Sequence, residues 1–238
     1  MNFQSDGIRL TASGVSCVRG GRPLFAGLSF ELAAGGAITV LGSNGAGKTS
    51  LLRMIAGLLA PAEGTIELRG GPGSVGEAAH FLGHLDAVNG ALSVSENLDF
   101  ARALLGGGGA SNEIALTRLG LNALQDLPAH MLSAGQRRRL ALARLLAAPR
   151  LIWLLDEPTA ALDAETEHAL FERYADAANT ADGRITVLVS HRFSTVRMAS
   201  LIIVLRGARV AEVGSHDELM ARGRHYAELY GIQAAAYR

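Results

Sequence analysis

A glycine-rich segment between an apolar run and a helical pattern constrains this chain more than any other feature. The apolar residues 38–41 lead into Gly42, Ser43, Asn44, Gly45, Ala46, Gly47, Lys48 and Thr49, and Ser50 then opens a stretch with apolar residues at helical spacing. Glycines let consecutive backbone amides turn inward around phosphate oxygens, and the N-terminus of the following helix adds partial positive charge. The pattern predicts a strand, a phosphate-binding loop and a helix. The alternative is a glycine turn that begins an ordinary helix.

The only lysine of the chain lies in this segment. Among the 22 Lys and Arg residues, every one except Lys48 is Arg. An Arg guanidinium is broad and planar, whereas a Lys ammonium is a compact point charge. We expect Lys48 to reach the β- and γ-phosphates of a nucleotide, Thr49 to offer its hydroxyl to Mg²⁺, and residues 42–50 to form the nucleotide contacts.

The composition favours one main domain with an insertion and no membrane segment. The 238 residues are 49% hydrophobic, and the 22 basic residues balance the 22 acidic ones. The chain therefore has no net positive charge that would attract it to nucleic acid or to an anionic membrane. Cys17 has no partner for an internal disulfide, the N-terminus lacks the apolar core of a signal peptide, and the apolar runs are shorter than the ~20 residues of a membrane helix. We expect a cytoplasmic chain that neither inserts into a membrane nor binds nucleic acid.

Two apolar patterns predict two kinds of sheet. Short alternations with Gly and Pro turns in the first 36 residues predict antiparallel strands that form a side sheet. Short buried runs at 38–41, 151–155 and 185–189, followed by helical periodicity, predict the strands of a covered parallel sheet. The fold class is therefore expected to be α/β, a P-loop NTPase with a parallel core sheet and an N-terminal antiparallel side sheet.

Strand signals disappear after residue 85, where helical segments flank the glycine run 106–109, which resembles a flexible loop. We interpret this region as a helical insertion. The expected division is a core of about 1–84 and 150–238 with a helical subdomain of about 85–149.

Two adjacent carboxylates end the second of the buried runs. The sequence LIWLLDE places Asp156 and Glu157 directly after an apolar strand, at the carboxyl edge where open α/β sheets bind ligands. We expect Asp156 to hold Mg²⁺, and Glu157 to polarise the water that attacks the γ-phosphate. A solvated turn after a buried strand is the alternative.

A third motif lies between these two. Leu132, Ser133, Ala134, Gly135 and Gln136 resemble the signature segment of ATP-binding cassette (ABC) proteins. Asp163 in the sequence ALD resembles the D-loop of that family, and His191 resembles its switch histidine. The resemblance implies that ATP and Mg²⁺ are the cofactors and that two copies form a head-to-tail homodimer in the ATP-bound state. It also implies that Glu157 and His191 are the catalytic pair.

The residues around the signature segment support this resemblance. Ser133 is a good N-cap, Gly135 permits close backbone approach, and a helix over 137–146 begins there, so its N-terminus can receive an anion. In the family that anion is the γ-phosphate held by the partner, which would bring Asp163 and residues 133–136 to the nucleotide. The run Arg137, Arg138 and Arg139 is interpreted as a solvated face rather than a nucleic-acid site, because no aromatic residues are interleaved with it.

Two positions depart from the usual ABC pattern. The aromatic residue on which many members stack adenine falls near Val18 or Arg19, and the Arg19 guanidinium could stack instead. The usual Gln at the end of the second core strand is replaced by His84, which puts His84 at the metal.

These departures point to a subfamily. Residues of about 8–160 resemble the ATP-binding subunit of the cytochrome c maturation haem exporter, whereas residues of about 156–238 resemble the end of a multidrug or lipid exporter ATPase domain. A hybrid of two parents and a divergent natural protein both account for this. The leading interpretation is a transport ATPase bound to integral membrane subunits on the cytoplasmic face of the inner membrane. A non-transport ABC ATPase, and a folded domain that binds nucleotide without driving transport, are the alternatives.

Overall fold

The fold is described from a computed structural model, in which residues 7–71, 73–158, 183–190, 196–197 and 199–236 are placed. Asp163 and His191 lie outside these described residues.

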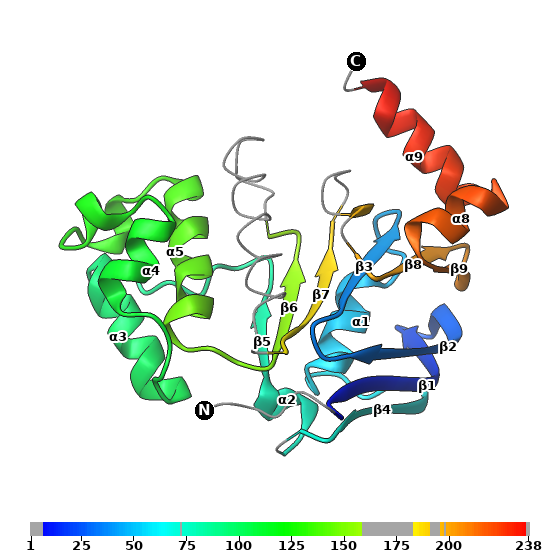
Figure 1. Ribbon diagram of the computed structural model, residues 1–238, viewed down its shortest axis with the longest axis horizontal. Coiled ribbons are helices and arrows are strands. Elements are labelled where there is room, and N and C mark those ends of the chain that lie inside the picture. Colours follow the sequence, from blue (N-terminus) through cyan, green and yellow to red (C-terminus); the bar gives the residue numbers. More distant parts are fainter. Residues whose placement is uncertain (1–6, 72, 159–182, 191–195, 198, 237–238) are drawn as a thin grey trace.

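A six-stranded sheet forms the centre of the molecule (Figure 1). Its strands, in spatial order, are β5 (Ala79–Leu82), β6 (Ile152–Asp156), β7 (Ile185–Val189), β3 (Ala37–Gly42), β8 (Leu201–Arg206) and β9 (Arg209–Gly214). The first five are parallel, and β9 is antiparallel to β8. The expected α/β architecture with a parallel core sheet is confirmed.

A separate antiparallel sheet lies beside the core sheet. It has the order β2 (Arg22–Ala33), β1 (Arg9–Arg19) and β4 (Glu63–Arg69). The side sheet expected from the first 36 residues is present, and its third strand comes from a later segment that the sequence patterns did not assign. Apolar residues of this sheet share one core with β3, with β6 and with helix α1 (Lys48–Ile55).

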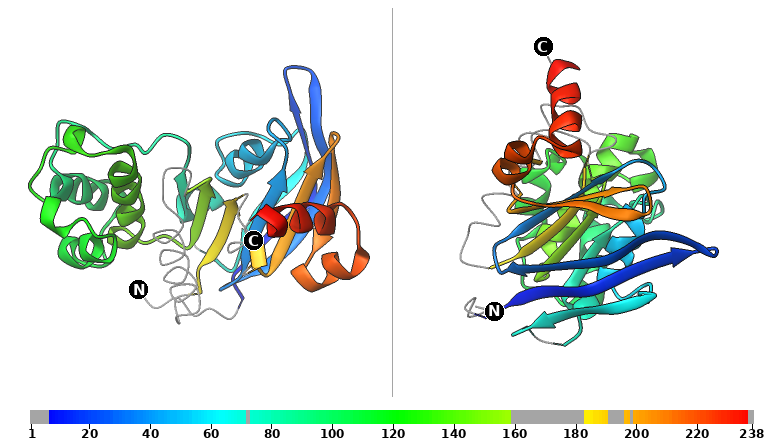
Figure 2. Two further views of the ribbon diagram at one scale, coloured as in Figure 1. Left: turned by 90° about the horizontal axis from the view of Figure 1, so that it is seen from above. Right: turned by 90° about the vertical axis from the view of Figure 1, so that its right-hand side faces the viewer.

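Two groups of helices lie at opposite ends of the molecule (Figures 1 and 2). Beyond β5 lie α3 (Val94–Leu105), α4 (Asn112–Arg118) and α5 (Ala134–Ala147), with the short 3-10 helices η1 (Asn122–Leu124) and η2 (Ala129–Met131). The short helix α2 (Val75–Ala78) precedes β5, and α8 (His216–Arg222) and α9 (His225–Ala236) follow β9. No described helix is long and apolar enough to cross a membrane.

Strand β6 joins two apolar cores because its side chains alternate between the two faces of the sheet. Ile152 and Leu154 pack in the core shared with α1 and the antiparallel sheet. Trp153 and Leu155 pack in a second core with α3, α4 and α5. All five residues of β6 are buried, so the carboxylate at its end is held on a rigid element.

Four of the helices begin with the same local device. In each, a Ser side chain at the N-cap accepts a hydrogen bond from the backbone amide three residues on, and the side chain there accepts one from the Ser amide. The pairs are Ser74 with Glu77, Ser93 with Glu96, Ser133 with Gln136, and Ser215 with Glu218. Helix α5 thus has the expected N-cap Ser133, and its first helical residue, Ala134, lies three residues before the expected helical start.

Candidate functional site

Residues 42–50, hereafter the phosphate loop, connect the carboxyl end of β3 to the first turn of α1. The Lys48 ammonium folds back over the loop and donates to the carbonyl oxygens of Gly42 at 2.8 Å and Ser43 at 3.2 Å. Lys48 is only 7% exposed, and this burial lowers its pKa, while the carboxylates of Glu157 and Asp156 act in the opposite direction. The one lysine of the chain is therefore a sequestered cation facing two acidic residues.

Two glycines of the phosphate loop are required by close packing as well as by backbone conformation. Gly42 has a φ of +150°, and a Cβ there would lie 2.5 Å from the Leu205 carbonyl oxygen of β8. Gly47 has a φ of +103°, and a Cβ there would lie 3.0 Å from the Phe25 ring of the side sheet. The loop is therefore held between the core sheet and the antiparallel sheet.

Asp156 is the last residue of β6 and Glu157 follows it, next to the phosphate loop. Thr49 Oγ1 donates to Asp156 Oδ2 over 2.8 Å, and Asp156 is 8% exposed. Glu157 is exposed and has a φ of +48°, which is uncommon for a residue other than glycine. Its amide donates to the Val189 carbonyl oxygen of β7 at 3.1 Å. Hydroxyl and carboxylate oxygens are the ligands that Mg²⁺ prefers, so the Thr49 and Asp156 side chains could hold this ion.

The signature segment forms the N-terminus of α5. Ser133 Oγ accepts from the Gln136 amide at 3.2 Å, and Gln136 Oε1 accepts from the Ser133 amide at 2.8 Å. The first amides of a helix have no intrahelical acceptor, and in α5 these belong to Ala134 and Gly135. Ser133 and Ala134 are exposed, so this helix end is accessible to an anion.

The interpretation of residues 137–139 as a solvated face was wrong for Arg138. Arg138 is 4% exposed, because its side chain points from α5 toward the ends of β5 and β6. A signal for this was present in the sequence. Arg138, Ala141, Leu142 and Leu145 share one helical face, and the last three are buried in the core.

The other predicted site residues lie near the sheet ends. Ser50 is half-buried in the first turn of α1, and Arg19 is exposed at the end of β1. His84 is exposed two residues after β5. Among the described residues, no group of three or more His, Cys, Asp and Glu side chains could hold a metal ion. The structure thus brings Lys48, Thr49 and Asp156 together, while the metal role of His84 stays a prediction.

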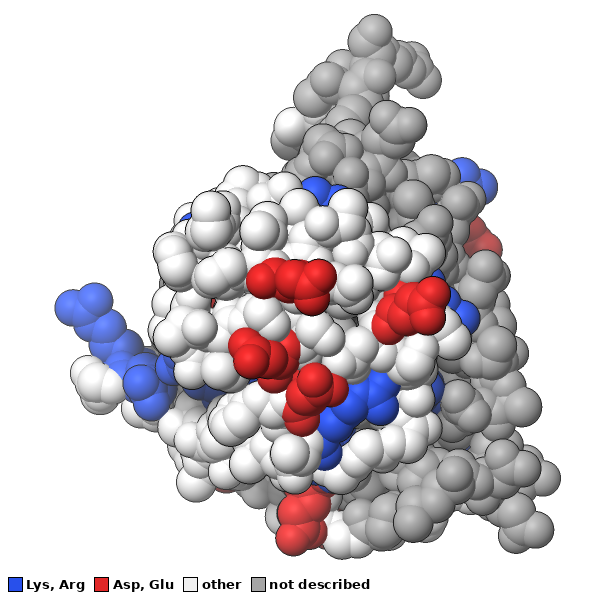
Figure 3. Space-filling view, turned by 90° about the vertical axis from the view of Figure 1, so that its left-hand side faces the viewer, with Lys and Arg blue, Asp and Glu red and all other residues white. Residues whose placement is uncertain are grey.

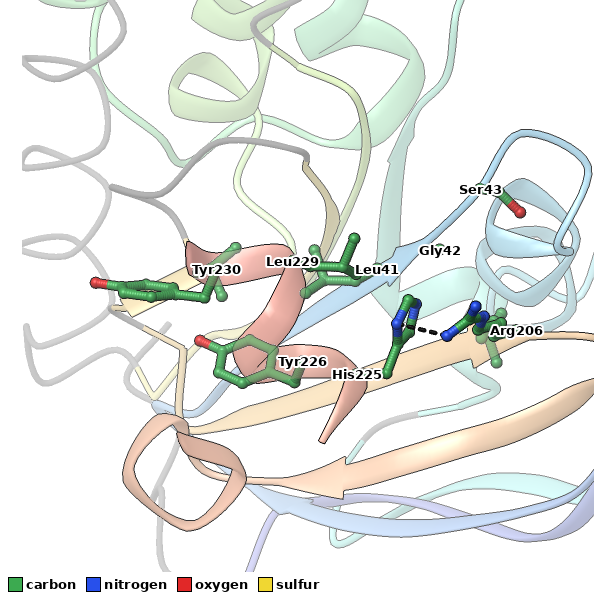
Figure 4. A pocket seen from close by; sticks show the side chains of 10 residues that line it. Leu41, Gly42, Ser43, Arg206, His225, Tyr226, Leu229 and Tyr230 are labelled. Atoms are coloured by element: carbon green, nitrogen blue, oxygen red, sulfur yellow. Dashed lines mark hydrogen bonds between the residues drawn. The ribbon is translucent and has the colours of Figure 1, made fainter. Parts of the chain in front are cut away.

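A cavity of about 310 Å³ lies beside the start of the phosphate loop, between β3, β8 and α9 (Figure 4). Its walls include Gly42 and Ser43, the apolar residues Leu41 and Leu205, and the rings of Tyr226 and Tyr230. Arg206 and His225 are hydrogen-bonded to each other at 2.7 Å along its edge. Helix α9 therefore lies close to the start of the phosphate loop.

The fold and the site define the class of this protein. A phosphate loop follows the inner strand β3 of a mainly parallel sheet, an acidic residue ends β6, which is separated from β3 by β7, and a helical region carries the signature segment. This is a P-loop nucleotide-binding domain. The family described as "ABC transporter" matches residues 25–160, and the chain belongs to this family. It is therefore an ATP-binding domain that hydrolyses ATP and works with membrane transporter partners.

Within the ABC family, this chain is similar to a particular group of export proteins. A cytochrome c biogenesis ATP-binding export protein of Nitrobacter winogradskyi is 52% identical over 186 residues, which are 77% of this chain and 92% of the relative. The protein of the same name from Bradyrhizobium diazoefficiens is 57% identical over 158 residues, 66% of this chain and 79% of the relative. A bacterial Atm1-family ABC exporter solved with ATP bound is 28% identical with a TM-score of 0.81. That match covers 96% of this chain, which spans 42% of the exporter chain.

Proposed function

We propose that this chain is the ATP-hydrolysing subunit of a haem-exporter-type transporter in cytochrome c biogenesis. It works as a homodimer when ATP is bound, on the cytoplasmic face of the inner membrane, together with integral membrane subunits. The names and identities of the relatives support the transport class. The main structural support for ATP hydrolysis at this site is the Thr49–Asp156 hydrogen bond, because it joins the phosphate loop to the carboxylate at the end of β6.

The phosphate loop binds the nucleotide in this proposal. Residues 42–50 surround the phosphates, and the Lys48 ammonium leaves the Gly42 and Ser43 carbonyl oxygens to bind the β- and γ-phosphates. Thr49 and Asp156 hold Mg²⁺, with His84 as a further candidate ligand. When bound, the ion neutralises charge on the phosphate oxygens. Arg19 stacks on the adenine through its guanidinium plane.

Glu157 polarises the attacking water, and His191 contacts the γ-phosphate. The position of Glu157 supports its role, since it follows Asp156 directly and lies at the carboxyl edge of the sheet. His191 lies outside the described residues, and its role is proposed from its place after β7 in the sequence.

Each nucleotide is bound by two chains in this proposal. The accessible N-terminus of α5, with Ser133, Ala134, Gly135 and Gln136, closes over the γ-phosphate held by the partner, and Asp163 also reaches that site. The exposure of Ser133 and Ala134 supports this. We propose the division into a core of 1–84 and 150–238 and a helical subdomain of 85–149 on the same grounds, because residues 85–149 would carry the signature segment to the partner.

Mixing two defective variants tests the composite site. Glu157→Gln and Ser133→Ala each impair both sites of a homodimer. A mixed dimer has one site with Glu157 of one chain and Ser133 of the other, and a second site with both defects. Turnover of the mixture should therefore exceed the mean of the two variants measured alone. Turnover equal to that mean, with dimers present in ATP, would contradict the composite site.

A further inference from the structure

Arg138 forms the densest set of polar contacts among the described side chains. A guanidinium has five N–H donors, and each one here has an acceptor. Nε donates to Pro158 O at 2.9 Å, and Nη2 donates to Asp156 O at 3.0 Å and Glu157 O at 3.1 Å. Nη1 donates to Gly83 O at 2.8 Å and Asp86 Oδ1 at 2.9 Å. Burying a charged guanidinium costs desolvation free energy even when all of its donors are hydrogen-bonded, and packing alone does not require a cation at this position.

Three of the acceptors are consecutive carbonyl groups. Successive carbonyls of an extended strand point to opposite sides, so those of Asp156, Glu157 and Pro158 can converge on one guanidinium only if the chain turns. The turn occurs at Glu157, which has a φ of +48°. A residue with a Cβ adopts this conformation only where its surroundings enforce it. The Arg138 hydrogen bonds are such a constraint.

Helix α5 holds a second residue of this kind in the same way. Ala87 has a φ of +51°, and Arg144 donates to its carbonyl oxygen at 2.8 Å and to that of Asp86 at 3.2 Å. Of the three described non-glycine residues with positive φ, two are thus held by arginines of α5. The arginines therefore act on backbone conformation, and Arg138 does so at Glu157.

We propose that Arg138 is a positioning residue for Glu157. It holds the Glu157 backbone in the left-handed conformation and thereby aims the carboxylate at the water that attacks the γ-phosphate. This inference rests on the proposed role of Glu157. A lysine cannot replace Arg138 in this task, because its three donors share one nitrogen and cannot reach acceptors spread around a planar fork.

The test compares Arg138→Lys and Arg138→Gln with Arg139→Lys. Arg139 is the neighbouring arginine of α5, and its guanidinium donates to the Leu119 carbonyl oxygen of the helical region, so it serves as the matched control. We expect kcat to fall by roughly ten- to hundred-fold in the Arg138 variants, as a small misplacement of a catalytic group does. The ATP dissociation constant should stay within about two-fold, because Lys48 is unaffected. The control should retain both values.

A double-mutant cycle separates positioning from general structural support. In a Glu157→Gln background the carboxylate is already lost, so adding Arg138→Lys should lower the residual turnover little further. The proposal is overturned if the Arg138 variants keep the parental kcat, if the two losses multiply, or if ATP affinity falls with kcat. Failure of both Arg138 variants to fold would overturn it too, because Arg138 would then be a structural residue. A Glu157→Gln variant with parental turnover would instead refute the proposed role of Glu157.

Discussion

Thr49 and Asp156 are 107 positions apart in the sequence, yet a 2.8 Å hydrogen bond joins their side chains. Thr49 is in the first turn of α1, and Asp156 is the last residue of β6, against which α1 packs. Both oxygens are thus fixed on regular elements that share one apolar core. The structure therefore holds the two oxygens that we propose as Mg²⁺ ligands side by side on rigid elements.

The first prediction concerns this oxygen pair. Thr49→Val removes the hydroxyl with little change in volume, and we expect the Mg²⁺ concentration for half-maximal turnover to rise by roughly ten-fold or more, as lost metal-site partners commonly do. Thr49→Ser retains the hydroxyl and should stay close to the parent. A Mg²⁺ titration of ATP hydrolysis checks this, and identical titration curves for the Val and Ser variants would exclude Thr49 as a ligand.

The second prediction uses two matched helix starts. Ser133 and Ser93 form the same capping box at the start of α5 and α3, so Ser→Ala at either position should lower the free energy of unfolding by ~1 kcal/mol. Only Ser133→Ala should also lower turnover, by about ten-fold or more, since it alone would contact a phosphate in the transition state. Urea unfolding and steady-state hydrolysis of both variants check this. Equal turnover losses would assign the effect to helix capping.

The third prediction separates two glycines of the phosphate loop. Gly45 has a φ of +80° with no atom within 4 Å of an added Cβ, so Gly45→Ala should cost only the backbone strain of ~1–2 kcal/mol. At Gly42 the Cβ would also meet the Leu205 carbonyl, and Gly42→Ala should cost about 3 kcal/mol or more. Equilibrium unfolding of the two variants tests this order. A Gly42→Ala protein as stable as Gly45→Ala would show that the loop can move away from β8.

The fourth prediction concerns acid stability. His80 is 8% exposed, and burial lowers its pKa to about 4, although its ring Nε2 donates to the Ala148 carbonyl oxygen. The unfolded chain, with an ordinary His pKa of ~6.5, binds the proton more readily, so stability is lost as the pH falls from ~6.5 toward 4. By pH 5 the loss from this group should be about 2 kcal/mol.

Replacing His80 by Gln keeps a donor for Ala148 but removes the titration. The variant should lose less stability than the parent between pH 7 and pH 5, while all other groups contribute equally to both proteins. Denaturant unfolding at the two pH values measures this difference. A variant and parent with the same pH dependence would exclude His80 as the acid-sensitive group.

The phosphate loop, the strand before the carboxylates and the cap of α5 could be predicted because each depends on neighbouring residues. The loop needs its glycines beside a strand and a helix, and Ser133 forms its cap with Gln136, only three positions on. By contrast, the Cys17 thiol lies against the Ser50 side chain in the first turn of α1. Such a contact depends on how two sheets pack, which local patterns do not encode.

The partners of Arg138 show why the rest of the site could not be predicted. The helical spacing indicated that Arg138 lies on a buried face, but its acceptors are main-chain carbonyls, which any residue type provides. Strand β4 was not predicted either. Only its Ile66 and Leu68 side chains are half-buried, so its apolar pattern in the sequence is weak. The domain limits, the hybrid origin and the roles of Asp163 and His191 stay predictions.

The solitary, sequestered Lys48 gives this protein a built-in chemical reporter. Because no other side chain carries a primary amine, an amine-selective acylating reagent can modify only Lys48 and the α-amino group. The bonds of its ammonium to Gly42 and Ser43 and its 7% exposure make it slow to react, and a bound phosphate would shield it further. The extent of labelling, read by intact mass, would therefore measure nucleotide occupancy without a fluorophore or an engineered residue.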